Sequence, residues 1–257
     1  MATAAEIAEA LDAVLGTRDT PDYPGALNGL QLDNRGPIRG VAAAVDFSRR
    51  TVAGAVERRA NLLIVHHGMF WGGAEPIRGP AYERLALLLA HDVAVYASHL
   101  PLDRHPELGN NVLLARELRL APSGEFARYK TIAVGVRGES DVPTSELARR
   151  AAAFAAAHGG TAVATPFPPD RRTRRWAICT GAGASAETLR EAAELGVDTL
   201  VVGEGPHYTA VHATDSGMVV IYAGHYATET LGVRAVAELV SGRFGVPWDF
   251  VEAPTGL

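Results

Sequence analysis

Histidine side chains follow three apolar segments of this sequence, and two of them precede an acidic residue by four positions. A His-His pair comes directly after LLIV, and single histidines follow VAVYAS and VVIYAG. Imidazole nitrogens and carboxylate oxygens are ligands of divalent cations such as Zn, Fe, Mn, Co and Ni. We therefore expect a site for two divalent metal ions with the following ligands: His66, His67, Asp103, His225 and Glu229.

Each of these residues also has an ordinary structural explanation when it is taken alone. A single histidine at the end of a strand is more often a packed or capping residue than a ligand. Adjacent residues of a strand point to opposite sides, so His66 and His67 would serve two different ions. His225 and Glu229 would share a helix face, but such pairs also occur as surface contacts. Only the combination of the three clusters predicts a metal site.

Short apolar runs alternate with amphipathic stretches, which predicts parallel βα units. The expected strands are 40–45, 61–65, 93–97, 131–136, 176–179, 199–202 and 218–222. The expected helices are 3–15, 48–59, 81–91, 110–118, 144–158, 186–195 and 227–241, and 161–175 is expected to be a loop. Thr3, Ser48 and Ser185 stand where helix N-caps belong. Ligands bind beyond the carboxyl ends of such strands, which is where the histidines lie.

An internal repeat indicates how these elements are organised. Ser48 and Thr51 align with Ser185 and Thr188, and in the same register NLLIV aligns with DTLVV. A second match places YASHLPLD over YAGHYATE, so that each copy has a strand, a histidine and an acid four residues later. We predict two related three-layer α/β lobes from an internal duplication, with the metal site in the inter-lobe cleft. The first lobe is expected at 1–125 plus about 226–257, and the second at 126–225.

Composition excludes several classes of protein. Of the 257 residues, 47% are hydrophobic and 21% are charged, which is a globular balance. The net charge of −5 disfavours a nucleic-acid partner. The single cysteine, Cys179, excludes a multi-thiolate metal site within one chain. No segment approaches the ~20 apolar residues that span a bilayer, so we expect no membrane association and a cytoplasmic location.

Five stretches of the chain resemble the Nif-three-like family of hexameric proteins with a dinuclear metal centre, some of which are described as type-2 GTP cyclohydrolase I. The stretches are NGLQLD (28–33), LLIVHHGMFWGG (62–73), HLPLDRHPELGNN (99–111), GVDTLVVGEG (196–205) and AGHYATETLGVRAV (223–236). The resemblance implies the same five ligands, with Glu229 bridging both ions and His99 as a neighbour or occasional ligand. Tyr226 departs from the family, where a second histidine often stands, and GEGPHY replaces a more acidic motif.

The resemblance also implies a toroidal homohexamer and a small-molecule or nucleotide substrate. Two ions can activate a shared water, so we expect a metal-dependent hydrolase of a nucleotide-like or phosphorylated substrate. On GTP the water would attack C8 of the guanine ring. His99, Glu204 or His207 would transfer protons. The alternative is a non-catalytic, metal-stabilised hexamer that acts as an adaptor, a regulator or a metal chaperone.

Two further features are open to more than one interpretation. GAGASAE (181–187) fits a loose dinucleotide-binding fingerprint, but a tight turn into a helix capped by Ser185 is the simpler interpretation. Phe70 and Trp71, beside the His-His pair, either line a substrate surface or pack against the fold.

Overall fold

The structure, a computed structural model, describes residues 1–71 and 75–257 and divides into two compact units. Unit 1 comprises Met1–Leu102 and Gly232–Ala253, and unit 2 comprises Asp103–Leu231 and Pro254–Leu257. Each unit contains one β-sheet, so the predicted mixed α/β class with two sheets is confirmed. Within the described ranges, no helix combines the length and the apolar character needed to cross a membrane.

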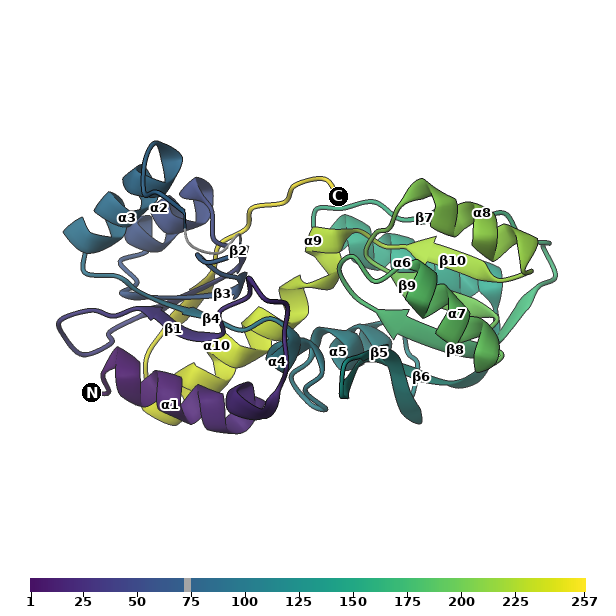
Figure 1. The fold of residues 1–257 in the computed structure, drawn as a ribbon, viewed down its shortest axis with the longest axis horizontal. Helices are drawn as coiled ribbons and strands as arrows, with labels where there is room; N and C mark the ends of the chain where they lie inside the picture. The colour runs from purple at the N-terminus through teal and green to yellow at the C-terminus, as the bar shows by residue number, and fades with distance from the viewer. Residues whose placement is uncertain (72–74) are drawn as a thin grey trace. The chain divides into compact units, whose positions relative to one another are not determined.

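Unit 1 is built on a five-stranded sheet of order β1-β4-β3-β2-β11 (Figure 1). Its strands are β1 (Gly29–Leu32), β2 (Val41–Asp46), β3 (Leu62–His67), β4 (Ala94–Ala97) and β11 (Trp248–Phe250). Its helices are α1 (Ala4–Leu15), α2 (Arg49–Glu57), α3 (Pro80–Ala90), most of α4 (Leu100–Asp103) and most of α10 (Thr230–Phe244), with a 3-10 turn at Thr17–Asp19.

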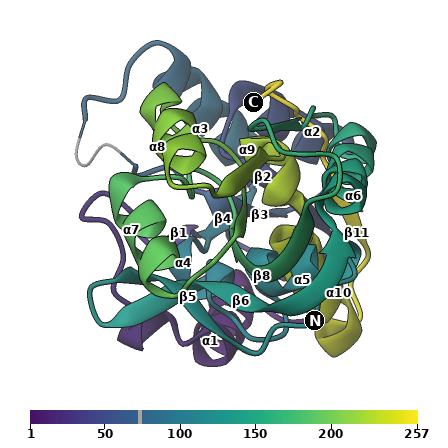
Figure 2. The same ribbon diagram turned by 90° about the vertical axis from the view of Figure 1, so that its right-hand side faces the viewer.

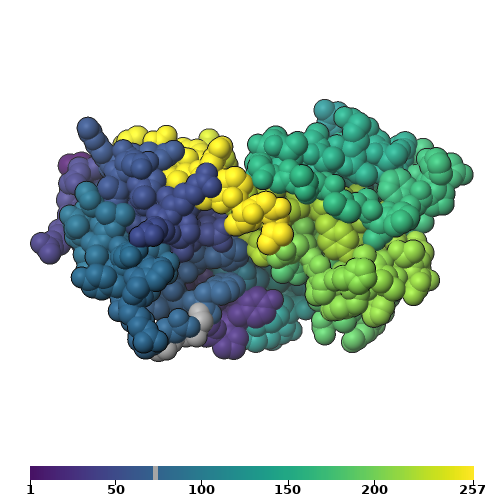
Figure 3. Space-filling view, turned by 90° about the horizontal axis from the view of Figure 1, so that it is seen from above, coloured from purple at the N-terminus to yellow at the C-terminus, as the bar shows by residue number. Residues whose placement is uncertain are grey.

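Both faces of the unit 1 sheet are covered, which explains why its central strands are almost wholly apolar. Helices α2 and α3 lie on one face, and α1 and α10 on the other (Figure 1). The blue surface in Figure 3 includes the residues of α2 and α3. Leu63, Val65 and Val95 pack with Val52 and Leu88 under α2 and α3. On the opposite face Tyr96 donates its hydroxyl to Asp12 of α1 at 2.9 Å.

Unit 2 is built on a six-stranded sheet of order β5-β6-β8-β9-β10-β7 (Figure 1). Its strands are β5 (Gly124–Tyr129), β6 (Ile132–Pro143), β7 (Val163–Ala164), β8 (Arg172–Cys179), β9 (Thr199–Val202) and β10 (Val219–Tyr222). Its helices are α5 (Asn110–Glu117), α6 (Thr144–Ala157), α7 (Ala186–Glu194), α8 (His207–Asp215) and α9 (His225–Thr228).

Alternate residues of β8 enter the two cores on either side of the unit 2 sheet, as side chains of a covered strand must. Trp176 and Ile178 pack with Leu114 and Leu147 under α5 and α6. Ala177, Cys179 and their neighbours pack under α7 and α8, on the other face (Figure 2). The chain enters unit 2 at Asp103, and α5 belongs to the core that contains Trp176, whereas the apolar pattern indicated a change of lobe near residue 125.

The two units repeat one topology. In each, three parallel strands lie side by side, β2-β3-β4 and β8-β9-β10, and an antiparallel strand flanks the last of them. The helices α2 and α7 begin with the same capping box, in which Ser48 pairs with Thr51 and Ser185 pairs with Thr188. The internal match found in the sequence therefore corresponds to equivalent elements of the fold.

All seven predicted strands are present, and so are the seven predicted helices, the last of which begins a few residues later than expected. Four strands were not predicted: β1, β5, β7 and β11. The prediction of a loop for 161–175 was wrong in part, because β7 and the start of β8 lie there. These unpredicted strands lie at or beside the sheet edges, where solvent exposure weakens the apolar pattern.

Candidate metal centre

Three histidines form a cluster in unit 1. His66 and His67 are the last two residues of β3, and His99 follows β4 after a single serine. His66 is fully buried and His99 is buried, and one ring nitrogen of each of the three lies within 4.8 Å of the others. The ring centroids of His66 and His99 are 4.9 Å apart. Parallel strand ends thus gather imidazoles at one edge of the sheet.

The two histidines of the pair hydrogen-bond to different partners. Nδ1 of His66 bonds to the carbonyl oxygen of Ser98 at 2.8 Å, and Nδ1 of His67 bonds to Oδ1 of Asp46 at 2.8 Å. A histidine that ligates a metal nearly always donates its other ring N–H to a carbonyl or a carboxylate, which fixes the ring. A metal ion bound to His66 or His67 would therefore be coordinated by Nε2.

His99 is held in the same way by a buried carboxylate. Its Nδ1 bonds to Oδ1 of Asp22 at 2.8 Å, and its backbone N–H donates to Asn28. Burial acts to raise the pKa of Asp22, but hydrogen bonds from His99 and Asn28, together with the charge of His99, hold that pKa below its ordinary value. An ionised Asp22 favours a proton on Nδ1 of His99.

Unit 2 places His225 between two carboxylates. His225 begins α9, and Glu229 follows the last residue of that short helix. Nε2 of His225 lies 3.1 Å from Oε2 of Glu229, and Nδ1 lies 2.7 Å from Oε1 of Glu204. Burial acts to lower the pKa of His225, but the hydrogen bonds and charges of Glu229 and Glu204 raise it to about 9. The surroundings of this ring therefore favour positive charge.

A second buried carboxylate lies beside Glu229. Asp103 is 5% exposed and Glu229 is 3% exposed, and an oxygen of one lies within 4.8 Å of an oxygen of the other. Asn110 donates to Oδ1 of Asp103 at 2.9 Å and fixes the orientation of that carboxylate. Two buried carboxylates at this separation repel each other unless a cation lies near them. Their arrangement fits a divalent ion.

A glycine leaves space next to the Glu229 carboxylate. Gly181 lies just beyond β8 and has a φ of +61°, in the left-handed region that favours glycine. A Cβ at this position would collide with Oε1 of Glu229 and come within 3.4 Å of Nε2 of His225. The backbone N–H of Gly181 donates to Thr228 at 3.1 Å. The turn GAGASAE therefore packs closely against the two ligand candidates and runs into α7, whose N-cap is Ser185.

A model of the Duf34/NIF3 (NGG1p interacting factor 3) family matches residues 2–255. The chain belongs to the Duf34/NIF3 family. A Deinococcus radiodurans relative, named GTP cyclohydrolase 1 type 2 homolog, is 40% identical over 242 residues, which cover 91% of this chain and 88% of that protein. A Pyrococcus abyssi relative of the same name is 40% identical over 252 residues, which cover 98% of both chains.

A solved structure of a Thermus thermophilus protein has the same fold. Its TM-score is 0.85 at 36% sequence identity, and the match covers 99% of this chain and 100% of that one. The family and fold implied by the sequence motifs are thus confirmed. The residues Gly72 and Gly73 of the LLIVHHGMFWGG motif lie outside the described part of the chain.

The donor atoms of this Duf34/NIF3 chain suit a divalent cation. Histidine nitrogens and carboxylate oxygens are gathered in both units, and they are ligands for Zn, Fe, Mn, Co or Ni. The thiol of Cys179 is buried, and burial raises its pKa, with the charges of Asp103 and Glu229 adding to the effect. A neutral buried thiol is a poor ligand. The chain therefore contains groups that could hold metal through nitrogen and oxygen alone.

The three residues expected to transfer protons have different surroundings. His99 lies in the histidine cluster of unit 1. Glu204 follows β9 and holds His225 through its carboxylate. His207 is the first residue of α8 and is exposed.

Two carboxylates that hold these histidines, Asp22 and Asp46, were not predicted from the sequence. Asp46 stands at the end of an apolar strand, which is a weak signal of a site residue, and Asp22 lies in a loop and has no such signal.

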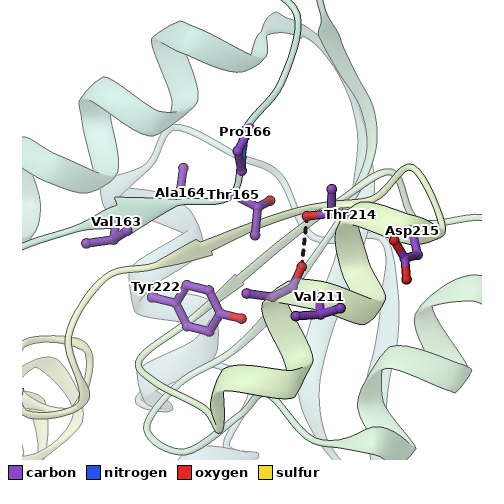
Figure 4. A pocket seen from close by; sticks show the side chains of 9 residues that line it. Val163, Ala164, Thr165, Pro166, Val211, Thr214, Asp215 and Tyr222 are labelled. Atoms are coloured by element: carbon purple, nitrogen blue, oxygen red, sulfur yellow. Dashed lines mark hydrogen bonds between the residues drawn. The ribbon is translucent and has the colours of Figure 1, made fainter.

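A pocket of about 410 Å³ in unit 2 is lined by none of these residues. It is formed by β7, the loop after it, α8 and Tyr222 of β10 (Figure 4). Of the described residues that line it, Asp215 alone is charged at neutral pH. The Tyr222 hydroxyl lies 2.7 Å from that of Thr209. This pocket therefore does not gather the groups that metal binding or hydrolysis requires.

Proposed function

We propose that this Duf34/NIF3 protein binds two divalent metal ions and hydrolyses a nucleotide-like or phosphorylated substrate. The proposed ligands are His66 and His67 from unit 1 and Asp103, His225 and Glu229 from unit 2, with Glu229 bridging the ions. The proposal requires both units to contribute to one centre. It is supported by the fact that each unit separately presents ring nitrogens or carboxylates with their supporting hydrogen bonds already formed.

One observation carries the metal assignment. Four histidines from three segments of the chain all have Nδ1 held by an oxygen, at distances of 2.7 to 2.8 Å. Three of these oxygens belong to the carboxylates of Asp22, Asp46 and Glu204. Packed histidines have no need of a repeated carboxylate partner, whereas metal-binding histidines use one to fix the ring and to make the ligating nitrogen more basic.

The two ions would supply Lewis-acid stabilisation of the charge that develops during hydrolysis. The chain's own groups would move the protons. With its Nδ1 proton held by Asp22, His99 has Nε2 as the atom that can accept a proton from water or return it to a leaving group. Glu204 orients His225 through Nδ1 and is the corresponding proton-transfer candidate in unit 2. His207 is a third candidate.

GTP is the first substrate to test, because the relatives from Deinococcus radiodurans and Pyrococcus abyssi carry the name GTP cyclohydrolase 1 type 2 homolog. In the proposed reaction water adds across the N7–C8 double bond of guanine, with its hydroxyl on C8 and its other proton on N7. The C8–N9 bond then breaks, the C8 hydroxyl becomes a formyl carbonyl, and its proton passes to N9. His99 Nε2 is assigned to carry the proton between these atoms.

Turnover should be measured on GTP and a phosphoester panel with protein reconstituted with Zn, Mn or Fe. The expected result is metal-dependent turnover that Glu229→Ala abolishes together with bound metal. Glu194→Ala, which changes an exposed glutamate at the end of α7, is the matched control and should keep both. Turnover by metal-free Glu229→Ala protein would refute the hydrolase. Metal binding with no turnover on the panel would favour the adaptor or metal-chaperone function.

We also propose that the protein works as a homohexamer in the cytoplasm. Support comes from the family resemblance of its motifs, and six copies of the 27.1 kDa chain would have a mass of about 163 kDa. Light scattering coupled to gel filtration should give that mass at micromolar concentration. A single species of 27.1 kDa would exclude the hexamer.

A further inference from the structure

Large apolar side chains are exposed around the histidine cluster of unit 1. Tyr23, Leu27, Phe70 and Trp71 have between 38% and 53% of their surface exposed. Burying such side chains is favourable, and an exposed group of them marks a place where a ligand or a partner binds. The four come from two separate segments, 23–27 and 70–71, so the sequence alone does not show that they are neighbours.

Two of the aromatic members of this group, Tyr23 and Trp71, contact the histidines directly. The Trp71 ring is 4.7 Å from the His99 ring, centroid to centroid, at an interplanar angle of 88°. It is also 5.2 Å from the His67 ring. The Tyr23 ring is 5.6 Å from that of His99 on a tilted plane. The exposed aromatic surface is therefore continuous with the side chains proposed to bind metal and to transfer protons.

Hydrogen bonds fix the two segments that carry these side chains. The Gln31 amide donates to the carbonyl of Leu27 at 2.5 Å and accepts from the backbone N–H of Met69 at 2.6 Å. Gly68 allows this close approach, because a Cβ there would collide with the Gln31 amide and with Ala97. Leu27, Phe70 and Trp71, together with His66 and His99, line a crevice that is too narrow to admit a water molecule, so the exposed rings form an outer surface and not a cavity. The surface is built in place before a ligand arrives.

We propose that Trp71, with Tyr23, Leu27 and Phe70, forms a stacking surface for a planar heterocyclic ring of the substrate, of the purine nucleotide class. This inference rests on the proposed hydrolase function. It names the part of the substrate that the proposed metal ions would not bind. Base stacking on aromatic side chains needs a flat exposed ring and few polar partners, which is what this surface offers. A ring bound there would lie next to His99, the residue proposed to move protons.

Binding of three probes separates ring recognition from phosphate recognition: guanosine, GTP and inorganic tripolyphosphate. Calorimetry on Zn-loaded and metal-free protein should show that Trp71→Leu weakens guanosine and GTP about ten-fold or more, since one stack of this kind accounts for a change of that order. Trp71→Phe should retain most of the affinity because it keeps an aromatic ring. Tripolyphosphate should bind equally to all variants.

The matched control is Tyr82→Leu, which removes an aromatic side chain that is 62% exposed on α3 of the same unit. It should bind all three probes like the wild type. Circular dichroism and thermal melts of each variant verify that it is folded. Unchanged guanosine and GTP binding by folded Trp71→Leu would overturn the proposal, as would wild-type protein that binds GTP no more tightly than tripolyphosphate.

The two proposals can fail separately. If guanosine binding depends on Trp71 but no nucleotide is turned over, the stacking surface stands and the hydrolase does not. If GTP is turned over with the same KM by Trp71→Leu and wild type, the hydrolase stands and the stacking surface does not. A change of oligomeric mass in Trp71→Leu with unchanged guanosine affinity would assign this surface to contacts between copies, and would also overturn the proposal.

Discussion

Asp46 is a carboxylate that holds the ring of a proposed metal ligand, His67, without being a proposed ligand itself. It bonds to Nδ1 of His67, and its strand β2 pairs with β3 so that Asp46 stands opposite His67 in the ladder. The strand pairing therefore holds donor and acceptor together before any ion binds. Loss of the carboxylate would leave His67 in place but free the ring to rotate.

Asp46→Ala should weaken metal binding by about 10- to 100-fold, the usual effect of removing such an outer partner. Asp46→Asn keeps an oxygen acceptor for Nδ1 and should lose less. Competition with a fluorescent Zn chelator measures both affinities. Asp249→Ala, at an exposed position of β11 in the same unit, is the control. Equal affinities for Asp46→Ala and wild type would argue against His67 as a ligand.

Gly181 tests the space around Glu229. Gly181→Ala places a Cβ against Oε1 of Glu229, so it should reduce bound metal in addition to the cost of a left-handed alanine, roughly 1–2 kcal/mol. Gly217→Ala has the same type of backbone, with a φ of +71°, but meets nothing within 4 Å. Gly217→Ala should lower the free energy of unfolding of the metal-free protein by an amount similar to Gly181→Ala, and it should keep its metal. Metal analysis and urea unfolding measure both quantities for each variant. Equal amounts of bound metal in the two variants would contradict the prediction.

At the residue scale the sequence predicted the histidines and acids of the candidate site but not the groups that hold them. The histidines follow long apolar strands, so the position of each is visible in the linear pattern. Asp22 lies in a loop far along the chain from His99, and only the folded chain brings the two to 2.8 Å. Supporting residues of this kind carry no signal in spacing or periodicity.

At the scale of elements, the two capping boxes are the clearest case of sequence determining structure. In α2 and α7 the serine side chain accepts from the backbone N–H of the threonine three residues on, and that threonine accepts in return from the serine N–H. The hydroxyls of Thr51 and Thr188 also donate to the backbone carbonyl oxygens of Asp46 and Gly183, at equivalent places in the turn before each helix. The turns before α2 and α7 are thus fixed by the same chemistry.

Ser48→Ala and Ser185→Ala should each destabilise the protein by about 1 kcal/mol, the usual contribution of an N-cap. Urea unfolding monitored by circular dichroism gives the change in free energy. The exposed Ser216→Ala, which follows α8 and caps no N-terminus, should have a smaller effect. A pair of cap variants as stable as wild type would show that neighbouring contacts, not the caps, determine these turns.

The central strands could be predicted because burial on both faces makes them continuously apolar, as in LLIV and TLVV. The strand β5 was not predicted, since it carries exposed charged residues such as Glu125 and Arg128, and β6 was predicted only over its apolar first half. The pair Val163–Ala164 is too short for any pattern. Tertiary pairing, not local propensity, creates these strands.

At the scale of the whole molecule, the proposed metal centre, with ligands from both units, would make the free energy of unfolding depend on the metal. Chelation should lower the melting temperature, because an ion that binds only the folded state stabilises it by about 2.7 kcal/mol at 100 times its dissociation constant. Adding back Zn should restore the original value. Glu229→Ala should melt at one temperature with or without Zn. If chelation leaves the melting temperature of the wild type unchanged, that result would contradict a metal centre shared by the two units.

The most direct test of the proposed two-metal centre is an anomalous difference map from crystals of Zn-loaded protein, with data collected at the Zn absorption edge. We predict two peaks per chain about 3.5–4 Å apart, the usual spacing of paired catalytic ions. His66 and Asp103 should lie at bonding distance from one peak, His67 and His225 from the other, and Glu229 from both. A single peak held by residues of one unit only, or no peak at these residues, would contradict the account.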